Sequence, residues 1–260
     1  MLQLRFILIS LGAAIGLFLF LLLCVEIGRH LGLRRMKRVG GPPSSGGIVD
    51  NAVYGLLALL IGFTFSGAAA RFDHRREMVG DEANAASTAW QRIELLPVAQ
   101  QDPVRDGLRQ YLDAVLEWYQ TPDKIDVALH QPASVTRAQE NVWRRSVEAC
   151  LTSQGDVARM LLLPALNELF DAVDRERMAR RLHPPAIVWL MLAITALASA
   201  LFVGYEFSGS PRNWLYIIGF TVSVAVSTYV IVELEYPRLG LATSASAIDR
   251  PLVEVRASLE

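Results

Sequence analysis

Residues 51–70 read NAVYGLLALLIGFTFSGAAA, a stretch of 20 residues without a single charged side chain. At 1.5 Å per residue, about 20 apolar helical residues cross the ~30 Å hydrocarbon core of a bilayer. Three further uncharged runs are at least as long, namely Phe6–Val25, Leu182–Tyr205 and Asn213–Val232. The sequence therefore predicts an all-α, polytopic integral membrane protein with four transmembrane helices.

Composition excludes several other classes of protein. Hydrophobic residues make up 52% of the 260 residues and charged residues 20%, which excludes a disordered chain. The formal net charge of -1 excludes a general nucleic-acid-binding surface. The two cysteines, Cys24 and Cys150, cannot form a disulfide framework, and the four histidines lack metal-ligand spacing. No enzyme motif occurs, so we expect neither catalysis nor a cofactor nor a metal site.

The uncharged runs divide the chain into four parts. Residues 1–70 hold the first two transmembrane helices, joined by a basic segment and the turn-forming linker Gly40–Gly47. We expect the first helix to end at Glu26. Residues 71–185 form a helical soluble domain, residues 186–232 hold the third and fourth transmembrane helices, and residues 233–260 form a C-terminal tail.

The second transmembrane helix is predicted to continue beyond the membrane. Apolar residues recur at alternating spacings of three and four after Ala70, which is the period of an amphipathic helix, and Pro97 ends the pattern. Acidic residues around this stripe suggest either a metal or proton-relay site or a solvated face paired with Arg75 and Arg76, and the solvated face is favoured. The stripe contains Val79, Ala83, Ala86, Trp90 and Ile93, and the acids around it are Glu77, Asp81 and Glu82. The acids Glu233 and Glu235, further along the chain, raise the same alternatives.

Three more amphipathic stripes predict helices in the rest of residues 71–185. Pro164 lies within the third stripe and is expected to kink that helix or to mark its first turn. The stripes are Val104, Leu108, Tyr111, Leu112 and Val115; Trp143, Val147 and Cys150; and Leu161, Leu162, Ala165, Leu169 and Val173.

The basic residues give two answers on orientation. Those after the first helix would place that loop in the cytoplasm. With the soluble domain inside, however, ten basic flanking residues lie on the cytoplasmic side and six on the other. The second count predicts a cytoplasmic soluble domain and cytoplasmic termini.

Three groups of motifs, in order along the chain, resemble the bestrophin family, and above all the bacterial bestrophin-like membrane proteins. The first runs from Tyr54 to Ser66, with its exit from Arg71 to Asn84. The second comprises Leu163–Glu168 and His183-Pro184-Pro185, and the third comprises Glu233–Gly240 and Ile248–Leu252. The matching positions outside the helix-two pattern include Asp81, Asn84, Glu235, Pro237, Gly240, Asp249 and Pro251.

The resemblance implies a four-span subunit that assembles as a homo-oligomer, a pentamer, around a central pore for small ions. The second helix would form a hydrophobic neck, and the soluble helices would lie in the cytoplasm. The multi-pass protein would sit in a bacterial inner membrane. Thr64-Phe65-Ser66-Gly67 replaces the polar segment of many bestrophin pore helices, and no run of acids is present for a calcium clasp.

The second helix allows two interpretations. Its glycines and alanines suit a helix-packing face, whereas bulky Leu59 and Phe63, one turn apart, suit a constriction that gates by dewetting. Arg71 at the end of the run either attracts anions at a pore mouth or is an interfacial arginine with its head group in water.

Two functions follow from these patterns. The first is a bestrophin-like oligomeric channel that conducts small, monovalent ions passively. The second is a membrane-anchored helical sensor or scaffold whose residues 71–185 bind a partner or ligand. The number of subunits in detergent distinguishes the two.

Overall fold

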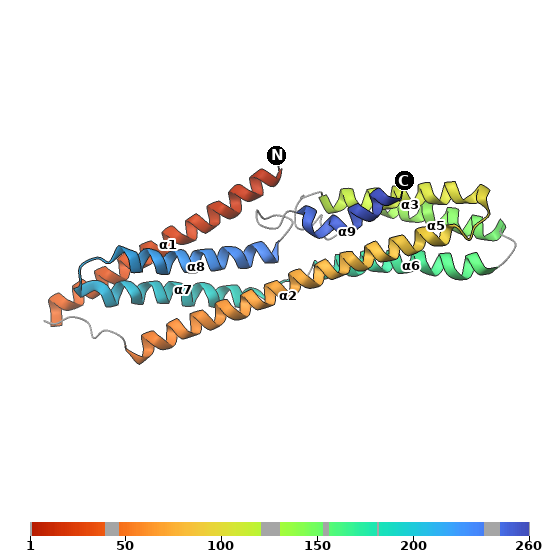
Figure 1. Ribbon diagram of the computed structural model, residues 1–260. Helices are drawn as coiled ribbons and strands as arrows, with labels where there is room; N and C mark the ends of the chain where they lie inside the picture. The colour runs from red at the N-terminus through yellow and green to blue at the C-terminus, as the bar shows by residue number, and fades with distance from the viewer. Residues whose placement is uncertain are drawn as a thin grey trace. The chain divides into compact units, whose positions relative to one another are not determined.

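A computed structural model describes residues 2–39, 47–120, 131–152, 156–180, 182–236 and 245–259. Every regular element in these ranges is a helix, which confirms the all-α prediction. Four of the helices are long and apolar enough to cross a membrane (Figure 1). The chain divides into two compact units, residues 1–71 with 184–236 and residues 72–183 with 237–260.

The membrane unit contains α1 (Leu2–Val39), the first half of α2 (Ile48–Ile93), α7 (Ala186–Glu206) and α8 (Trp214–Glu235). A short 3₁₀ turn, Phe207–Gly209, follows α7. Helix α1 packs against both α7 and α8. Apolar side chains from all four helices form the core of this unit, among them Leu21, Leu57, Ala200 and Ile217.

Glycines allow α1 and α7 to approach each other very closely. A Cβ atom at Gly28 would collide with the backbone of Leu201, and one at Gly204 would collide with the carbonyl of Val25. A Cβ atom at Gly32 would likewise collide with Ser208. Small residues are the usual means of close helix packing in membranes, where the lipid offers no hydrophobic driving force between helices.

The expectation that the first helix ends at Glu26 is wrong, because α1 continues to Val39. The basic residues of this extension have partners that the sequence pattern did not reveal. Arg29 donates to the carbonyl of Ser210 at 3.2 Å, and Arg35 donates to the hydroxyl of Tyr205. Positive charges in the last turn also interact favourably with the negative end of the helix dipole.

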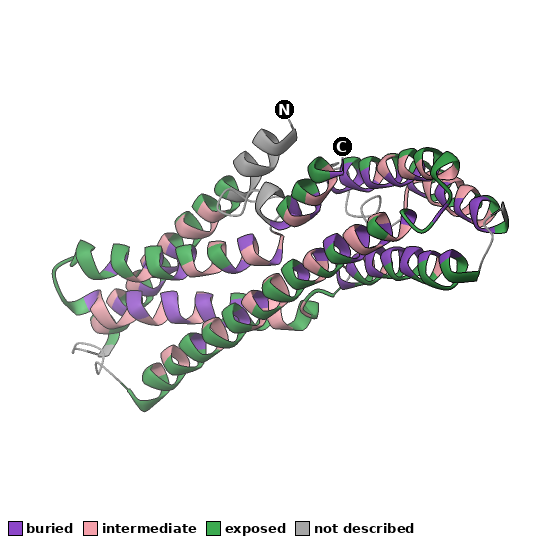
Figure 2. Cartoon of the chain, turned by 45° about the vertical axis from the view of Figure 1, so that its right-hand side comes forward, coloured by how far each residue is buried: buried purple, intermediate pink, exposed green. Residues whose placement is uncertain are grey.

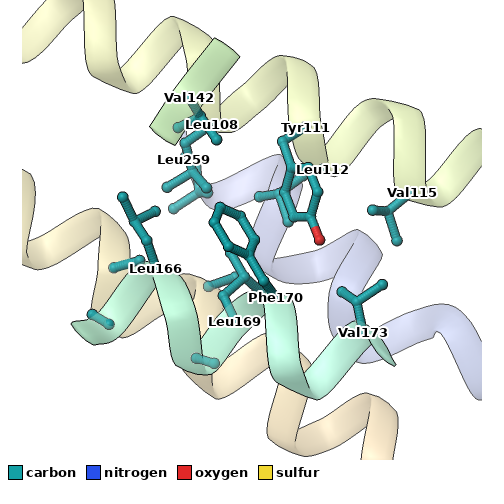
Figure 3. Packing of buried hydrophobic residues seen from close by; sticks show 14 of the residues in the cluster. Leu108, Tyr111, Leu112, Val115, Val142, Leu166, Leu169, Phe170, Val173 and Leu259 are labelled. Carbon is teal, nitrogen blue, oxygen red and sulfur yellow. The ribbon is translucent and has the colours of Figure 1, made fainter. Parts of the chain in front are cut away.

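The soluble unit consists of the second half of α2 with α3 (Val98–Gln120), α5 (Ala133–Thr152), α6 (Asp156–Ala179) and α9 (Ala245–Ser258). Helix α3 packs against α5 and α9, and α5 packs against α6. Tyr111 meets Phe170 edge to face, with the ring centroids 5.2 Å apart, in the core shown in Figure 3. The C-terminal segment thus contributes to a core, through Ile248, Leu252 and Leu259.

Most of the predicted stripes are buried. All members of the α2 stripe lie in the core except Trp90, which is partly buried against it, and the whole α3 stripe is buried. In α5 the buried face is centred on Val142 and Ala149 instead of on Trp143 and Val147. In α6, Leu161 is exposed while the rest of the stripe is buried, and the helix continues through Pro164. The linker Gly40–Gly46 lies outside the described residues.

Candidate functional site

The membrane-spanning half of α2 has one covered face and one uncovered face. Leu57, Thr64 and Ala68 are buried, each with at most 9% of its surface exposed. On the other side Leu59 is 53% and Phe63 67% exposed, and Leu56 extends this face by one turn toward the helix start. Figure 2 shows the exposed residues along this part of α2. The two residues that we predicted to form a neck therefore share an uncovered face.

Gly55 and Gly62 lie on the same face as the two bulky residues. Both are exposed, and a Cβ atom at either position would meet nothing within 4 Å. Within one subunit these glycines therefore serve no close contact. They differ in this respect from the glycines of α1 and α7.

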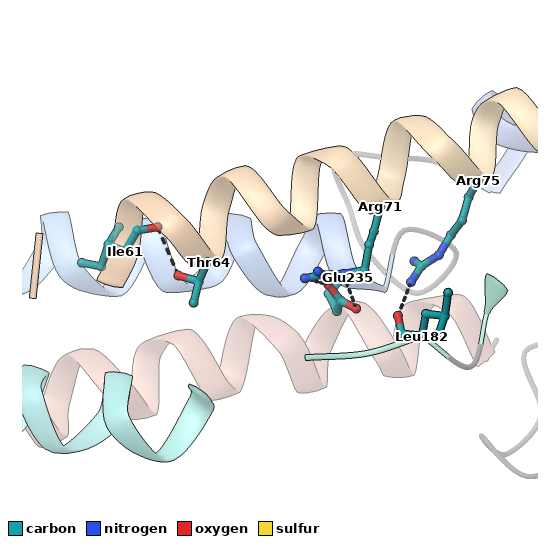
Figure 4. A network of polar contacts seen from close by, with 6 residues as sticks. All are labelled: Ile61, Thr64, Arg71, Arg75, Leu182 and Glu235. Atoms are coloured by element: carbon teal, nitrogen blue, oxygen red, sulfur yellow. Dashed lines mark hydrogen bonds and ion pairs between the residues drawn. The ribbon is translucent and has the colours of Figure 1, made fainter. Parts of the chain in front are cut away.

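Thr64 presents no hydroxyl donor to the uncovered face. Its hydroxyl donates to the carbonyl of Leu60 at 2.7 Å and to that of Ile61 at 3.1 Å, within the same helix. Figure 4 shows the bond to Ile61. A threonine whose hydroxyl bonds to the backbone of its own helix is tolerated in a membrane helix without a polar partner on another helix. Because Thr64 also lies on the covered face, its hydroxyl adds no polar group to the uncovered face.

Arg71 forms an ion pair that the sequence did not predict. Its Nε and Nη2 atoms lie 3.0 and 2.9 Å from Oε2 of Glu235, the last residue of α8 (Figure 4). The Glu235 side chain is fully buried, and that of Arg71 is 28% exposed. The pair thus joins α2 to α8. The carboxylate of Glu235 neutralises Arg71, the arginine that we predicted at a pore mouth.

A second buried carboxylate lies just before this pair in α8. Glu233 is 3% exposed and accepts a hydrogen bond of 2.6 Å from the hydroxyl of Tyr229, one turn earlier. The only sign of this ion pair in the sequence is that Glu233 and Glu235 follow one apolar run and Arg71 follows another. The residues of the ion pair lie 164 positions apart, so the pattern alone could not join them.

Within the soluble unit, two charged side chains of α2 are buried, contrary to the predicted solvated face. Glu82 is fully buried and accepts a hydrogen bond of 2.9 Å from the hydroxyl of Tyr119. Arg75 is 6% exposed and donates to the carbonyl of Leu182 at 3.5 Å. Burial is possible because these groups find polar partners on neighbouring segments. Glu77 and Asp81 are exposed, as the solvated face requires.

A cation lies among the aromatic rings beside Glu82. The guanidinium of Arg180 lies 4.2 Å from the ring centroid of Tyr119 and 4.8 Å from that of Trp118. It also pairs with Glu176 at 2.5 Å, and the Glu176 side chain is 1% exposed. The contacts tie α3 to the end of α6 through charge and cation–π attraction.

The other family-motif residues differ in their surroundings. Asn84 is exposed on α2, whereas Asp249 is buried and Pro251 lies within α9. Pro237 and Gly240 lie outside the described residues. The described motif residues of the soluble unit thus include both exposed and buried side chains.

Neither metal ligands nor reactive thiols gather in the described ranges. No group of three or more His, Cys, Asp or Glu side chains in them could hold a metal ion. Cys24 and Cys150 are both buried, and neither forms a disulfide. Burial raises the pKa of the Cys150 thiol, so the less reactive protonated form is favoured.

Comparison with known proteins gives a family and a fold. The Bestrophin-like domain model matches residues 15–242. A bacterial bestrophin homolog from Klebsiella pneumoniae, solved by Zn-SAD phasing, is 16% identical with a TM-score of 0.69, covering 94% of this chain and 98% of that chain. A variant of the Klebsiella pneumoniae homolog is 15% identical with a TM-score of 0.71, covering 95% and 98%. No curated protein matches. The chain therefore belongs to the Bestrophin-like domain family.

Proposed function

We propose that the protein is the subunit of a homo-oligomeric ion channel, a pentamer, through which small monovalent ions pass passively. The observation that carries this proposal is the uncovered face of α2, with Leu59 and Phe63 exposed in a single subunit. Further copies of the chain would cover or enclose that face. Family membership supports the proposal, because bestrophins are anion channels.

In the proposed channel, α2 lines the neck, and Leu59 and Phe63 form its constriction. Both side chains are bulky and stand beside Gly55 and Gly62, so they project furthest from the helix. An apolar constriction excludes ions by expelling water from the passage. A smaller side chain at either position should therefore admit water and raise ion flux.

Arg71 contributes little to anion attraction in this proposal. Its charge is balanced by Glu235 at 2.9 Å, so Arg71 is not an isolated positive charge at the end of the neck. The pair instead holds α2 against α8. The neck itself, and not this arginine, is the proposed barrier.

Flux through liposomes tests the neck. We expect Phe63→Ala and Leu59→Ala to raise ion flux while the oligomer stays intact, measured with separate anion and cation indicators. Leu190→Ala is a matched control, since Leu190 is 54% exposed on α7. If both neck variants form intact oligomers and neither adds flux, the proposed neck is refuted.

We further propose that the protein lies in the bacterial inner membrane with its soluble unit in the cytoplasm. The count of ten basic flanking residues against six supports this orientation. A cytoplasmic reporter inserted near His130 should be active, and a reporter active only outside the cytoplasm should be silent. The reverse pattern would overturn the proposed orientation.

A partner-binding scaffold is the second candidate, and one feature of the soluble unit favours it. A polar groove of about 510 Å³ lies along α3 and α5, where Asn141 donates to Gln110 at 3.4 Å. Arg137, Glu140 and Arg144 provide both signs of charge along it. Mass measurement in detergent separates the candidates, because five copies fit the channel and one or two copies fit the scaffold.

A further inference from the structure

A second hollow, of about 330 Å³, lies in the membrane unit. Its walls come from the first half of α2, the end of α7 and the middle of α8. Most of its lining is apolar, including Ile61, Phe220 and Val224. Because all three helices are long and apolar enough to span a bilayer, this hollow lies at the depth of the membrane, where acyl chains are available to fill it.

Two polar groups stand in this apolar lining. The hydroxyl of Tyr54 is buried and has no hydrogen-bond partner in the part of the chain that the structure describes. Glu206 also lines the hollow. A buried polar group without a partner costs free energy, so a ligand that bonds to it gains correspondingly. Neither group takes part in the proposed neck.

The polar and apolar parts of the hollow are ordered along the helices. Glu206 is the last residue of α7, and Tyr54 lies in the second turn of α2. Ile61 lies seven residues further along α2, which is about 10 Å deeper at 1.5 Å per residue. The hollow is thus polar near the helix ends and apolar toward the middle of the span, the same order as in a phospholipid.

The charge of the polar end selects among phospholipids. The carboxylate of Glu206 repels a head group with net negative charge and attracts an ammonium group. The cation Arg212, six residues after Glu206 in the sequence, does not reverse this choice, because it pairs with Glu26. A hydroxyl such as that of Tyr54 can donate to a phosphate or ester oxygen, which every phospholipid carries.

We infer that this hollow binds a phosphatidylethanolamine molecule, with its ammonium group against Glu206 and an acyl chain along Ile61 and Val224. The Tyr54 hydroxyl donates to an oxygen of the same lipid. Lipid binding at this place is independent of ion conduction. A flux experiment that refutes the neck would therefore not refute the lipid site, and a lipid-binding experiment that refutes the site would not refute the neck.

Native mass spectrometry of the delipidated full-length protein tests the site. Phosphatidylethanolamine and phosphatidylglycerol with identical acyl chains are added separately, and bound lipid is counted per subunit. We expect the wild type to favour the ethanolamine lipid about tenfold, the ratio that one charge-assisted hydrogen bond supports. Glu206→Gln should bring the ratio close to one, while the distant Glu94→Gln should leave it unchanged.

Three further variants address the hollow itself. Ala58 lines the hollow, so Ala58→Phe should displace either lipid, whereas Ala52→Phe adds the same group to an exposed position of α2 outside the lining. Tyr54→Phe keeps the ring and should weaken both lipids equally, which provides a test even if Ala58→Phe fails to fold. The inference is overturned if the wild type binds both lipids equally, or if its preference survives Glu206→Gln. Retention of bound lipid by folded Ala58→Phe, or unchanged binding by Tyr54→Phe, also overturns it.

Discussion

Replacing Gly204 by alanine should destabilise the membrane unit, because the added methyl group points into the backbone of α1. The new Cβ atom would lie 2.7 Å from the carbonyl carbon of Val25 and 2.9 Å from the amide nitrogen of Arg29. Ordinary contacts begin at 3.4 Å, so α1 and α7 would have to separate at this point. Backbone atoms cannot rotate away as the end of a flexible side chain can.

The size of the effect follows from two opposing contributions. Overpacking of this kind costs about 1–3 kcal/mol, and the collision with backbone places it at the upper end. Alanine gains about 1 kcal/mol over glycine as a helix former. The net expectation is therefore a loss of about 2 kcal/mol, from overpacking less propensity.

Gly16→Ala is the matched control for this prediction. Gly16 lies in α1, and a Cβ atom there would meet nothing within 4 Å. The same methyl group should therefore be neutral or raise stability by up to about 1 kcal/mol. Unfolding of both variants in mixed micelles, followed by tryptophan fluorescence, measures the difference. If Gly204→Ala proved as stable as Gly16→Ala, the close packing of α1 on α7 would be refuted.

Three more predictions concern single groups. Ala83→Pro should lower the unfolding free energy by about 3 kcal/mol or more, since it breaks α2 at a buried position, and an unchanged thermal transition would contradict this. Burial raises the pKa of Tyr111 well above 10, so above about pH 10 the unfolded chain loses the phenol proton before the folded protein does. The free energy of unfolding is therefore unaffected by this group below about pH 10 and falls at higher pH. Tyr111→Phe should abolish that fall in denaturant titrations between about pH 9 and 11.5, and should not destabilise the protein at neutral pH. Arg71→Met should cost about 3–5 kcal/mol and the double change with Glu235→Met less, whereas additive losses would show that the ion pair is not coupled.

Features with a regular period were predictable from the sequence. The four spans follow from run length, and the extension of α2 follows from the spacing of Val79, Ala83 and Ala86. Such patterns report which face of a helix is covered, whatever covers it. For the same reason the α3 stripe was predicted correctly without knowledge of its neighbours.

Features that depend on a distant partner were not predictable. The burial of Glu82 requires Tyr119, and the position of Arg71 requires Glu235. Glu26 marks the first charge after an apolar run, yet α1 continues because the following residues contact α7 and the turn after it. The neck formed by Leu59 and Phe63 stays a prediction, since a single subunit leaves their face uncovered.

The glycine contacts between α1 and α7 can form only after α7 has been synthesised, so α1 is in the membrane without its partner for some time. Gly28 and Gly204 are 176 positions apart, so at 5–20 residues per second α1 precedes its partner by about 9–35 s. Lipid can solvate the apolar surface of α1 during that interval, because membrane helices are stable individually before they associate. Two separately translated halves of the chain, divided within residues 121–130, should therefore be able to insert independently and reassemble in the membrane.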